Sequence, residues 1–353
     1  MKNVLIKVFA TIFIFLFSGF VSVAYSEEWI EKVVVDKEFK INKDAELIID
    51  HEFGNVRCEN WDKDIISIVA TVKVNTSNTE KAYQIIENVL VEVKGTKAKV
   101  EAICDLNQKY RNNKNSKVTI DFDIKMPVTV SLNLENKFGS AYVESVSGPA
   151  NISSEYGSLE IISLSNTNNS VEVKFGDANI KHMTNGDLEI SYSHLKIAGA
   201  EELSIESEYS DISIVKAKSI SLELEGGNIT IGSVSDFDVE SSFANIELQN
   251  LSGSITGETD YGSLTIANVK NIFSSITLLN EYGAISINFE KESNYSFIAD
   301  GKYCSIEYPK EEAKISYNNT SHSSTVIKGI VGNESSPASS VTVKSEYGAV
   351  VIK

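Results

Sequence analysis

The stretch "EYGSLEI", residues 155–161, recurs as "DYGSLTI" at 260–266, "EYGAISI" at 281–287 and "EYGAVVI" at 346–352. Each copy starts with an acidic and an aromatic residue, continues with glycine and a small residue, and ends in alternating apolar positions. Such alternation is typical of a β-strand with one buried face. A chain that repeats this pattern is predicted to consist of small, similar β units.

A longer register connects these copies. At spacings of 17 to 21 residues, the aromatic position is occupied by Phe138, Tyr156, Phe175, Tyr192, Tyr209, Gly226, Phe243, Tyr261, Tyr282 and Tyr303. Apolar residues recur three, five and eight positions after it, and a second alternating run precedes it. At the aromatic position the alternation of inward and outward side chains shifts by one residue. We therefore expect the chain to turn a corner there, with the aromatic and the next residue both pointing inward.

A unit of this size cannot close a core alone, but stacked units bury one continuous apolar column. The sequence therefore predicts an all-β fold, a single-stranded β-solenoid of about ten rungs of 17 to 21 residues. Stacked rings on successive rungs are favourable by roughly 0.5–1.5 kcal/mol per pair. Before the first three aromatics, Lys137, Glu155 and Lys174 alternate in sign, which predicts ion pairs between rungs.

The N-terminus has the features of a signal peptide. Lys2 and Lys7 precede an apolar run over residues 8–20, and small residues follow at Ala24 and Ser26. We expect residues 1–26 to be removed and the protein to be exported. No further apolar run is long enough for a membrane span.

Residues 27–136 are predicted to form an N-terminal strand-rich cap. It contains a first rung, "HEFGNVRCENW" at 51–61, which has the same offsets as the later repeats. It also contains one helix, capped by Asn78 or Thr79. The apolar face of that helix is formed by Ala82, Ile85, Ile86 and Val89.

The remaining chain divides into a regular and an irregular part. We predict a regular β-solenoid over 137–303 and irregular C-terminal rungs with a cap over 304–353. The last seven-residue copy of the repeat finishes the chain.

Charge and cysteine content limit the possible partners. Removing residues 1–26 takes away Lys2 and Lys7 and no acidic residue, so the formal net charge falls from -17 to -19. Nucleic acid and anionic lipid are disfavoured, because their phosphates would be repelled. Cys58, Cys104 and Cys304 form no CxxC motif; a Cys58–Cys104 disulfide and buried free thiols are both compatible with the sequence.

The sequence resembles the exported bacterial adhesin family of the head-GIN kind. The resemblance rests on the signal peptide, on "LIIDHEFGNVRCENWDKDIISIVATV" at 47–72 and on "LENKFGSAYVESVSGPANISSEYGSLEI" at 134–161. It covers nearly the whole mature chain. The resemblance implies a β-solenoid and a location in the cell envelope, but no proven activity and no functional residues to carry over.

The sequence assigns no catalytic, cofactor-binding or metal-binding residue. The four histidines, His51, His182, His194 and His322, form no HExxH motif and are expected to be structural or solvated. Glu208 and Glu225 stand on adjacent rungs, and we expect them to diverge into solvent rather than bind Ca²⁺. The acid pairs Asp236 with Asp238 and Glu201 with Glu202 are expected to be solvated at turns.

We therefore expect a non-catalytic, exported, adhesin-like protein that serves binding or scaffolding in the periplasm or at the cell surface. A glycan or protein could bind one flat face of the solenoid. The alternative is a lyase-like or hydrolase-like β-helix enzyme acting on polysaccharides, although the mature chain has only Arg57 and Arg111 as arginines. Function is expected where the repeat breaks, at Gly226, His194 or residues 304–345.

Overall fold

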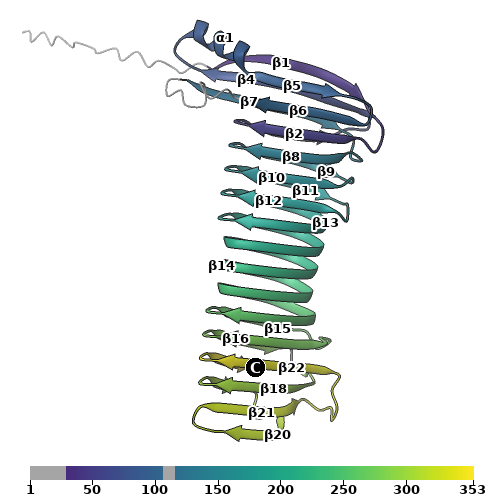
Figure 1. Cartoon of the computed structure of the whole chain (residues 1–353). Coiled ribbons are helices and arrows are strands. Elements are labelled where there is room, and N and C mark those ends of the chain that lie inside the picture. Colours follow the sequence, from purple (N-terminus) through teal and green to yellow (C-terminus); the bar gives the residue numbers. More distant parts are fainter. Residues whose placement is uncertain (1–28, 106–115) are drawn as a thin grey trace, which may run out of the picture.

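The computed structural model describes residues 29–105 and 116–353, and the predicted signal peptide lies outside them. In these residues the chain is nearly all β-structure with one helix, and it winds into an elongated stack of layers (Figure 1). No helix among the described residues has the length and apolarity needed to cross a membrane.

The first elements contain the single helix. They are β1 (Trp29–Lys40), β2 (Glu46–Glu52), β3 (Val56–Asn60), β4 (Ile65–Asn75), α1 (Thr79–Asn88), β5 (Leu90–Gly95), β6 (Lys99–Asp105) and β7 (Lys117–Met126). The middle of the stack follows with β8 (Ser131–Lys137), β9 (Ala141–Val146), β10 (Ala150–Glu155), β11 (Ser158–Leu164), β12 (Asn169–Lys174), β13 (Asp177–Ser191), β14 (His194–Asp260), β15 (Ser263–Val269), β16 (Ser275–Glu281) and β17 (Ala284–Phe289). The last strands are β18 (Tyr295–Lys302), β19 (Ser305–Glu307), β20 (Ala313–Thr320), β21 (Ser324–Val331), β22 (Ser339–Glu346) and β23 (Ala349–Ile352).

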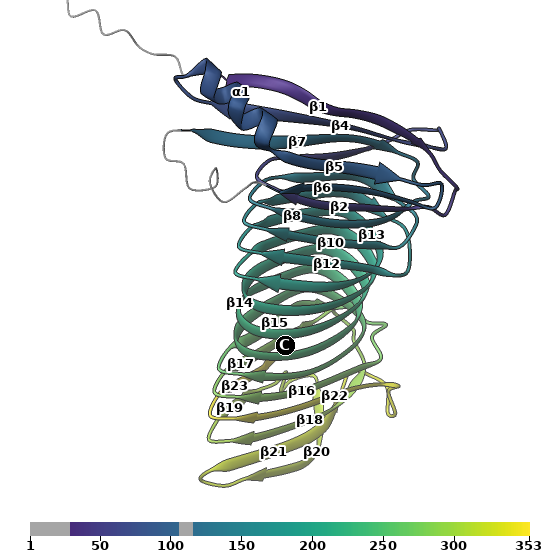
Figure 2. The same ribbon diagram turned by 45° about the horizontal axis from the view of Figure 1, so that its top comes forward.

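Strands in the middle of the stack pair in parallel with the equivalent strand one layer away. Ile152 of β10, for example, pairs with Leu134 of β8 on one side and Val171 of β12 on the other. We use the word rung for one layer, which consists of the strand before a corner and the strand after it. The 67-residue β14 continues through several rungs without a break (Figures 1 and 2).

The apolar columns expected after each corner form the core. Residues three and five positions after the corner, such as Leu159, Ile161 and Ile180, are buried on every rung of the middle stack. The third column, eight positions after the corner, is also buried except at Ala200, which is partly buried. Parallel pairing places each apolar side chain over its equivalent on the next rung, so one core runs along the whole stack.

The corners turn as expected, but the predicted direction of the aromatic side chains was wrong. The aromatic residues have positive φ angles between 46° and 61°, in the left-handed region, and their side chains are exposed except at Phe53, which is partly buried. This conformation rotates the side chain outward, and the residue after it, such as Ser210, points into the core. The parity slip is thus absorbed by one left-handed residue.

Both ends of the stack have a sequence order that differs from the spatial order. The first rung, β2 with β3, lies between the β6–β7 layer and the β8–β9 rung. Likewise β22 with β23, the last strands of the chain, lie between β16–β17 and β18–β19. Tyr347, rather than Tyr303, therefore stacks on Tyr282. The antiparallel hairpin of β20 and β21 forms the outer layer beyond β18 (Figure 2).

The predicted helix is confirmed as α1, next to β1 and β4 at the N-terminal end of the stack (Figure 1). Asn78 is its N-cap, and its side chain accepts a hydrogen bond of 2.9 Å from the Lys81 backbone N–H. Ala82, Ile85 and Ile86 are buried on the predicted face.

Candidate binding surface

The outward aromatic residues form a column that we call the aromatic ladder. It consists of a first run, Phe53, Phe138, Tyr156, Phe175, Tyr192 and Tyr209, and a second run, Phe243, Tyr261, Tyr282, Tyr347 and Tyr303. Neighbouring ring centroids within each run are 4.8–5.6 Å apart, and the ring planes differ by 2–21°. The predicted stacking of rings on successive rungs is confirmed, on the outer surface instead of in the core.

The aromatic ladder brings little net stability. A left-handed conformation costs a non-glycine residue about 1–2 kcal/mol. One ring contact per rung returns roughly 0.5–1.5 kcal/mol, and half-burial of the ring adds roughly 1 kcal/mol. These terms are of similar size. Residues that keep a strained backbone conformation with little gain in fold stability are a feature of functional surfaces.

A polar column runs beside the aromatic ladder, two residues after each corner. Its members are Asn55, Ser140, Ser158, Asp177, His194, Asp211, Asn228, Asn245 and Ser263. Asn245 shows how the column is linked, because its Nδ2 donates to Asn228 Oδ1 at 3.4 Å and its Oδ1 accepts from Ser263 Oγ at 2.8 Å. The surface thus offers ring edges on one side and hydrogen-bonding groups on the other.

His194 belongs to this polar column and lies between two aspartates of the neighbouring rungs. Its Nδ1 lies 3.2 Å from Asp177 Oδ1 and its Nε2 lies 3.7 Å from Asp211 Oδ2. All three side chains are well exposed, and Asp211 also accepts from the Asn228 side chain at 2.9 Å. The sequence could not show this arrangement without the rung register.

A column of glutamates lies three residues before the corners, on the other side of the aromatic ladder. Six consecutive rungs carry it, at Glu172, Glu189, Glu206, Glu223, Glu240 and Glu258. Lys174 pairs with Glu172 and lies 3.6 Å from Glu189. Neither Lys174 nor Lys137 pairs with Glu155, so the predicted pairs between rungs were wrong; Lys137 instead pairs with Glu135 on its own strand at 2.6 Å.

Among the corners that the structure describes, Gly226 is the one inside the stack without an aromatic side chain. Its φ of 72° is left-handed, which glycine adopts at no steric cost. Tyr209 leans over it: an added Cβ at Gly226 would lie 2.8 Å from Tyr209 Cδ1. The Tyr209 hydroxyl donates to Glu225 Oε1 at 3.0 Å, and this bond raises the pKa of Tyr209. Both Glu208 and Glu225 are exposed.

A surface depression of about 400 Å³ opens beside this corner. Its charged lining residues are Glu206, Glu208, Glu223, Glu225 and Glu240, and Phe243 lies at its edge. A second depression of about 290 Å³ continues along the same face, past Asp238 and Glu258. Among the described residues, none of the five glutamates forms an ion pair.

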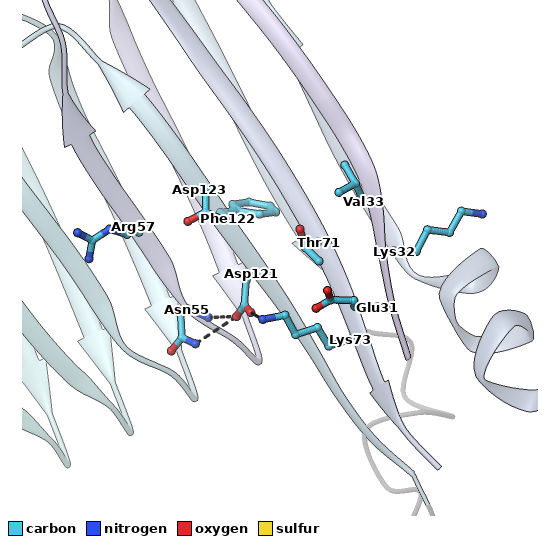
Figure 3. A pocket seen from close by; sticks show the side chains of 10 residues that line it. All are labelled: Glu31, Lys32, Val33, Asn55, Arg57, Thr71, Lys73, Asp121, Phe122 and Asp123. Atoms are coloured by element: carbon cyan, nitrogen blue, oxygen red, sulfur yellow. Dashed lines mark hydrogen bonds and ion pairs between the residues drawn. The ribbon is translucent and has the colours of Figure 1, made fainter. Parts of the chain in front are cut away.

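A larger depression of about 450 Å³ lies at the N-terminal end, lined by residues of β1, β4 and β7 together with Asn55 and Arg57 (Figure 3). Asn55 and Lys73 converge there on Asp121, whose Oδ1 accepts from the Asn55 backbone N–H at 2.9 Å and whose Oδ2 lies 2.9 Å from Lys73 Nζ. The bond to Asp121 raises the pKa of Lys73. Because Lys73 and Asp121 already pair with each other, we interpret this group as structural. It holds the end layer against the first rung.

Arg57, on the rim of the same depression, is also engaged within the protein. Its guanidinium donates to Glu59 Oε1 from Nε and Nη2, at 2.8 and 2.6 Å, and lies 4.4 Å from the centre of the Tyr142 ring. The bond to Glu59 raises the pKa of Arg57. Arg57 therefore stabilises the first rung by an ion pair and a cation–π contact.

The other histidines are not brought together. His51 is fully buried, 2.7 Å from Asn136 Oδ1 and 2.6 Å from the Ile120 carbonyl, and burial lowers its pKa. His182 and His322 are exposed. Within residues 29–105 and 116–353, no three His, Cys, Asp or Glu side chains are grouped as metal ligands.

The cysteines are thiols, and no disulfide joins Cys58 to Cys104. Burial raises the pKa of Cys58 to about 12, and Cys104 Sγ accepts from the Glu52 backbone N–H at 3.4 Å. Cys304 is partly buried at the corner after Tyr303.

The acid pairs are spread along the surface. Asp236 accepts from the Ser254 hydroxyl at 2.7 Å, which links two rungs. Asp238 faces the 290 Å³ depression together with Glu240. Glu201 and Glu202 are exposed, and Glu202 accepts from Asn185 at 3.0 Å.

No protein-family model matches this chain, and no curated protein matches it significantly. Among solved structures, a "putative cell adhesion protein" from Clostridium sporogenes is 9% identical over 92% of this chain and 99% of its own, with a TM-score of 0.19. A "putative lipid binding protein" from Parabacteroides distasonis is 15% identical over 74% and 97%, with a TM-score of 0.32. A "putative adhesin" from Bacteroides fragilis is 11% identical over 93% and 98%, with a TM-score of 0.23. At these TM-scores the three structures carry no argument about this chain.

Proposed function

We propose that this chain is a β-solenoid of the adhesin-like kind, exported to the cell envelope, where it acts as a non-catalytic binding or scaffold protein. The parallel pairing of successive rungs supports the solenoid. Its ligand, in this proposal, is an extended polysaccharide that lies along the aromatic ladder.

The observation that carries this proposal is the aromatic ladder with its flanking polar column. The column of exposed ring edges gives an apolar strip for the C–H groups of sugars, and the neighbouring column of amides, hydroxyls and carboxylates can bind their hydroxyl groups. Repetition lets many weak contacts add along a polymer. The near balance of strain and stacking also means that fold stability alone gives little reason to keep rings at these corners.

The test is binding of the mature chain to a panel of immobilised polysaccharides. We expect binding to at least one polysaccharide, and a loss of it when Tyr156, Phe175 and Tyr192 are all replaced by Ser. The matched control replaces Val215 and Ile272, two exposed apolar side chains outside the aromatic ladder, by Ser. Absence of binding to every polysaccharide, or an equal loss in the control, would overturn the proposal.

Two further measurements address location and chemistry. Digestion of the protein on intact cells would support a surface location, and protection until lysis would support the periplasm. Reducing-end and unsaturated-product assays on the same panel test the alternative of a polysaccharide-acting enzyme. Turnover that disappears in Asp238→Asn would overturn the non-catalytic proposal.

A further inference from the structure

The interruption of the aromatic ladder at Gly226 leaves an open place, which we call the Gly226 notch. It lies between Tyr209 and Phe243, at the corner of Gly226, which is itself buried with the Tyr209 ring leaning over it. Tyr209 stacks on Tyr192 and Phe243 stacks on Tyr261, but in the described structure no ring contact joins Tyr209 to Phe243. Phe243 is 63% exposed, as much as the end ring Tyr303 at 62%, so it presents an uncovered face.

The width of the Gly226 notch suits one ring. Neighbouring strands lie about 4.8 Å apart, so the two rungs between Tyr209 and Phe243 separate their corners by roughly 10 Å. A single ring stacked on Phe243 would have, on that side, the spacing that the aromatic ladder shows elsewhere. Tyr209 already leans into this space toward Glu225, so an entering ring stacks on Phe243 and meets the tilted face of Tyr209.

The charge around the Gly226 notch selects the kind of ring. Five glutamates line the adjoining 400 Å³ depression, and neither lysine nor arginine lines it. On earlier rungs the same glutamate column is neutralised by Lys174, which engages both Glu172 and Glu189. The column therefore lacks cations from Glu206 to Glu240, beside the missing ring. A cation in this position gains both carboxylate and aromatic contacts.

The polar column completes the site on the other side of the corner. Asn228 and Asn245 follow Gly226 and Phe243 by two residues, and both are exposed. Within the column each amide donates one hydrogen bond from Nδ2 and accepts one at Oδ1. Its second N–H and the second lone pair of its oxygen remain as further hydrogen-bonding capacity. A ligand ring with several hydroxyl groups fits this edge better than a purely aromatic cation.

We propose that the Gly226 notch binds the pyranose ring of a positively charged amino sugar within an oligosaccharide. The C–H face of the sugar stacks on Phe243, its ammonium group lies among Glu223, Glu225 and Glu240, and its hydroxyls face Asn228 and Asn245. This inference rests on the proposed function and specifies the sugar class at one place on the same surface.

The test is calorimetric titration of the mature chain with a glucosamine hexamer, and with its fully N-acetylated form as the uncharged probe. We expect the glucosamine hexamer to bind at least about tenfold more tightly, and its affinity to fall with added salt. Glu223→Gln combined with Glu225→Gln should weaken it about tenfold, and Phe243→Ala should weaken it similarly. Gly226→Tyr, which fills the notch, should abolish it.

Two controls keep the result interpretable. Glu172→Gln removes a glutamate of the same column that Lys174 already neutralises, and it should leave the affinity unchanged. Circular dichroism shows whether each variant is folded, and the Glu223 and Glu225 variants test the site even if Gly226→Tyr fails to fold. Equal binding of both hexamers, no binding of the glucosamine hexamer, or unchanged affinity in the glutamate variants would overturn this inference. Loss of all polysaccharide binding would overturn the proposed function as well, whereas binding of neutral polysaccharides alone would overturn only the notch.

Discussion

The corner at Tyr156 and the corner at Gly226 both begin with a left-handed residue but differ in their surfaces, and at the second corner Gly227 also has a positive φ, of 99°. Tyr156 has a φ of 54° and contacts a ring on each side; Gly226 has a φ of 72° and no side chain. The fold therefore needs the conformation at every rung and does not need the ring. This difference separates what the corner does for folding from what the aromatic ladder offers to a partner.

The largest effect is expected one residue after the corner, where the rungs around Gly157 approach closely. A Cβ on the present backbone of Gly157 would lie 1.8 Å from the Gly139 carbonyl oxygen, so a large side chain would force the two rungs apart. We expect Gly157→Val to lower the free energy of unfolding by about 3–5 kcal/mol, measured by urea denaturation. Gly199→Ala is the control, because the nearest atom to its added Cβ is 4.0 Å away. A change below about 1 kcal/mol in Gly157→Val would show that the corner can shift freely.

Valine is the appropriate substitution because smaller residues occupy this position elsewhere. Ser193 donates to the Ser191 carbonyl at 2.7 Å, and Ser210 donates to the Glu208 carbonyl at 2.8 Å. A serine at Gly157 could make the same hydrogen bond as these two serines. Its stability would then not show whether this corner needs a residue without a large side chain.

The next effect separates ring contacts from backbone strain at Tyr156. Tyr156→Ala loses two ring contacts and half-buried area but keeps the strain, so we expect a loss of about 2–3 kcal/mol. Tyr156→Gly loses the same contacts but relieves the strain, so it should be more stable than the Ala variant by about 1 kcal/mol. In an ordinary strand glycine is the worse of the two. An Ala variant at least as stable as the Gly variant would contradict a strained corner.

The reciprocal change at Gly226 should have a smaller effect. Gly226→Ala introduces left-handed strain without any ring contact, so we expect it to cost about 1–2 kcal/mol in urea denaturation. Gly226→Tyr pays the same strain but gains contacts with the neighbouring rings, and should change stability by less than about 1 kcal/mol. A Tyr variant less stable than the Ala variant would show that Tyr209 cannot leave the space above Gly226.

The sequence predicted the parts of this surface that depend on local pattern. The 17 to 21 residue register identified the corners, the stacking of rings such as Tyr156 on Phe175, and the buried columns. The helix followed from its cap at Asn78 and its apolar face. These features are local or repeat at a fixed interval, so one sequence contains enough information to find them.

Other features depend on three-dimensional neighbours that the sequence order conceals. The outward aromatic side chains were missed because the inward parity of the preceding strand was carried on to the aromatic position, and a positive φ is unexpected for Phe or Tyr. The position of β22 between β16 and β18 was missed because pairing was expected to follow the chain order. The unpaired glutamates at Glu206 and Glu223 become visible only after the rungs are aligned and Lys174 is placed.

The smallest effect concerns the proton on Tyr209, at the boundary between the aromatic ladder and the Gly226 notch. The hydrogen bond to Glu225 stabilises the neutral phenol, so the pKa of Tyr209 is raised from its ordinary value of 10.0. The folded chain therefore binds more protons than the unfolded chain above that value, and the stability from this bond is complete below about pH 10 and is lost as the pH rises through the folded pKa. Tyrosinate absorbance of the wild type minus that of Tyr209→Phe measures this titration.

Glu225→Gln should return the pKa of Tyr209 toward 10.0 while leaving that of Tyr282 raised, because burial is the main cause at Tyr282. A Tyr209 that titrates at its ordinary value in the wild type would mean that its ring stays in line with the aromatic ladder. The Gly226 notch would then be wider than it is with the Tyr209 ring leaning into it.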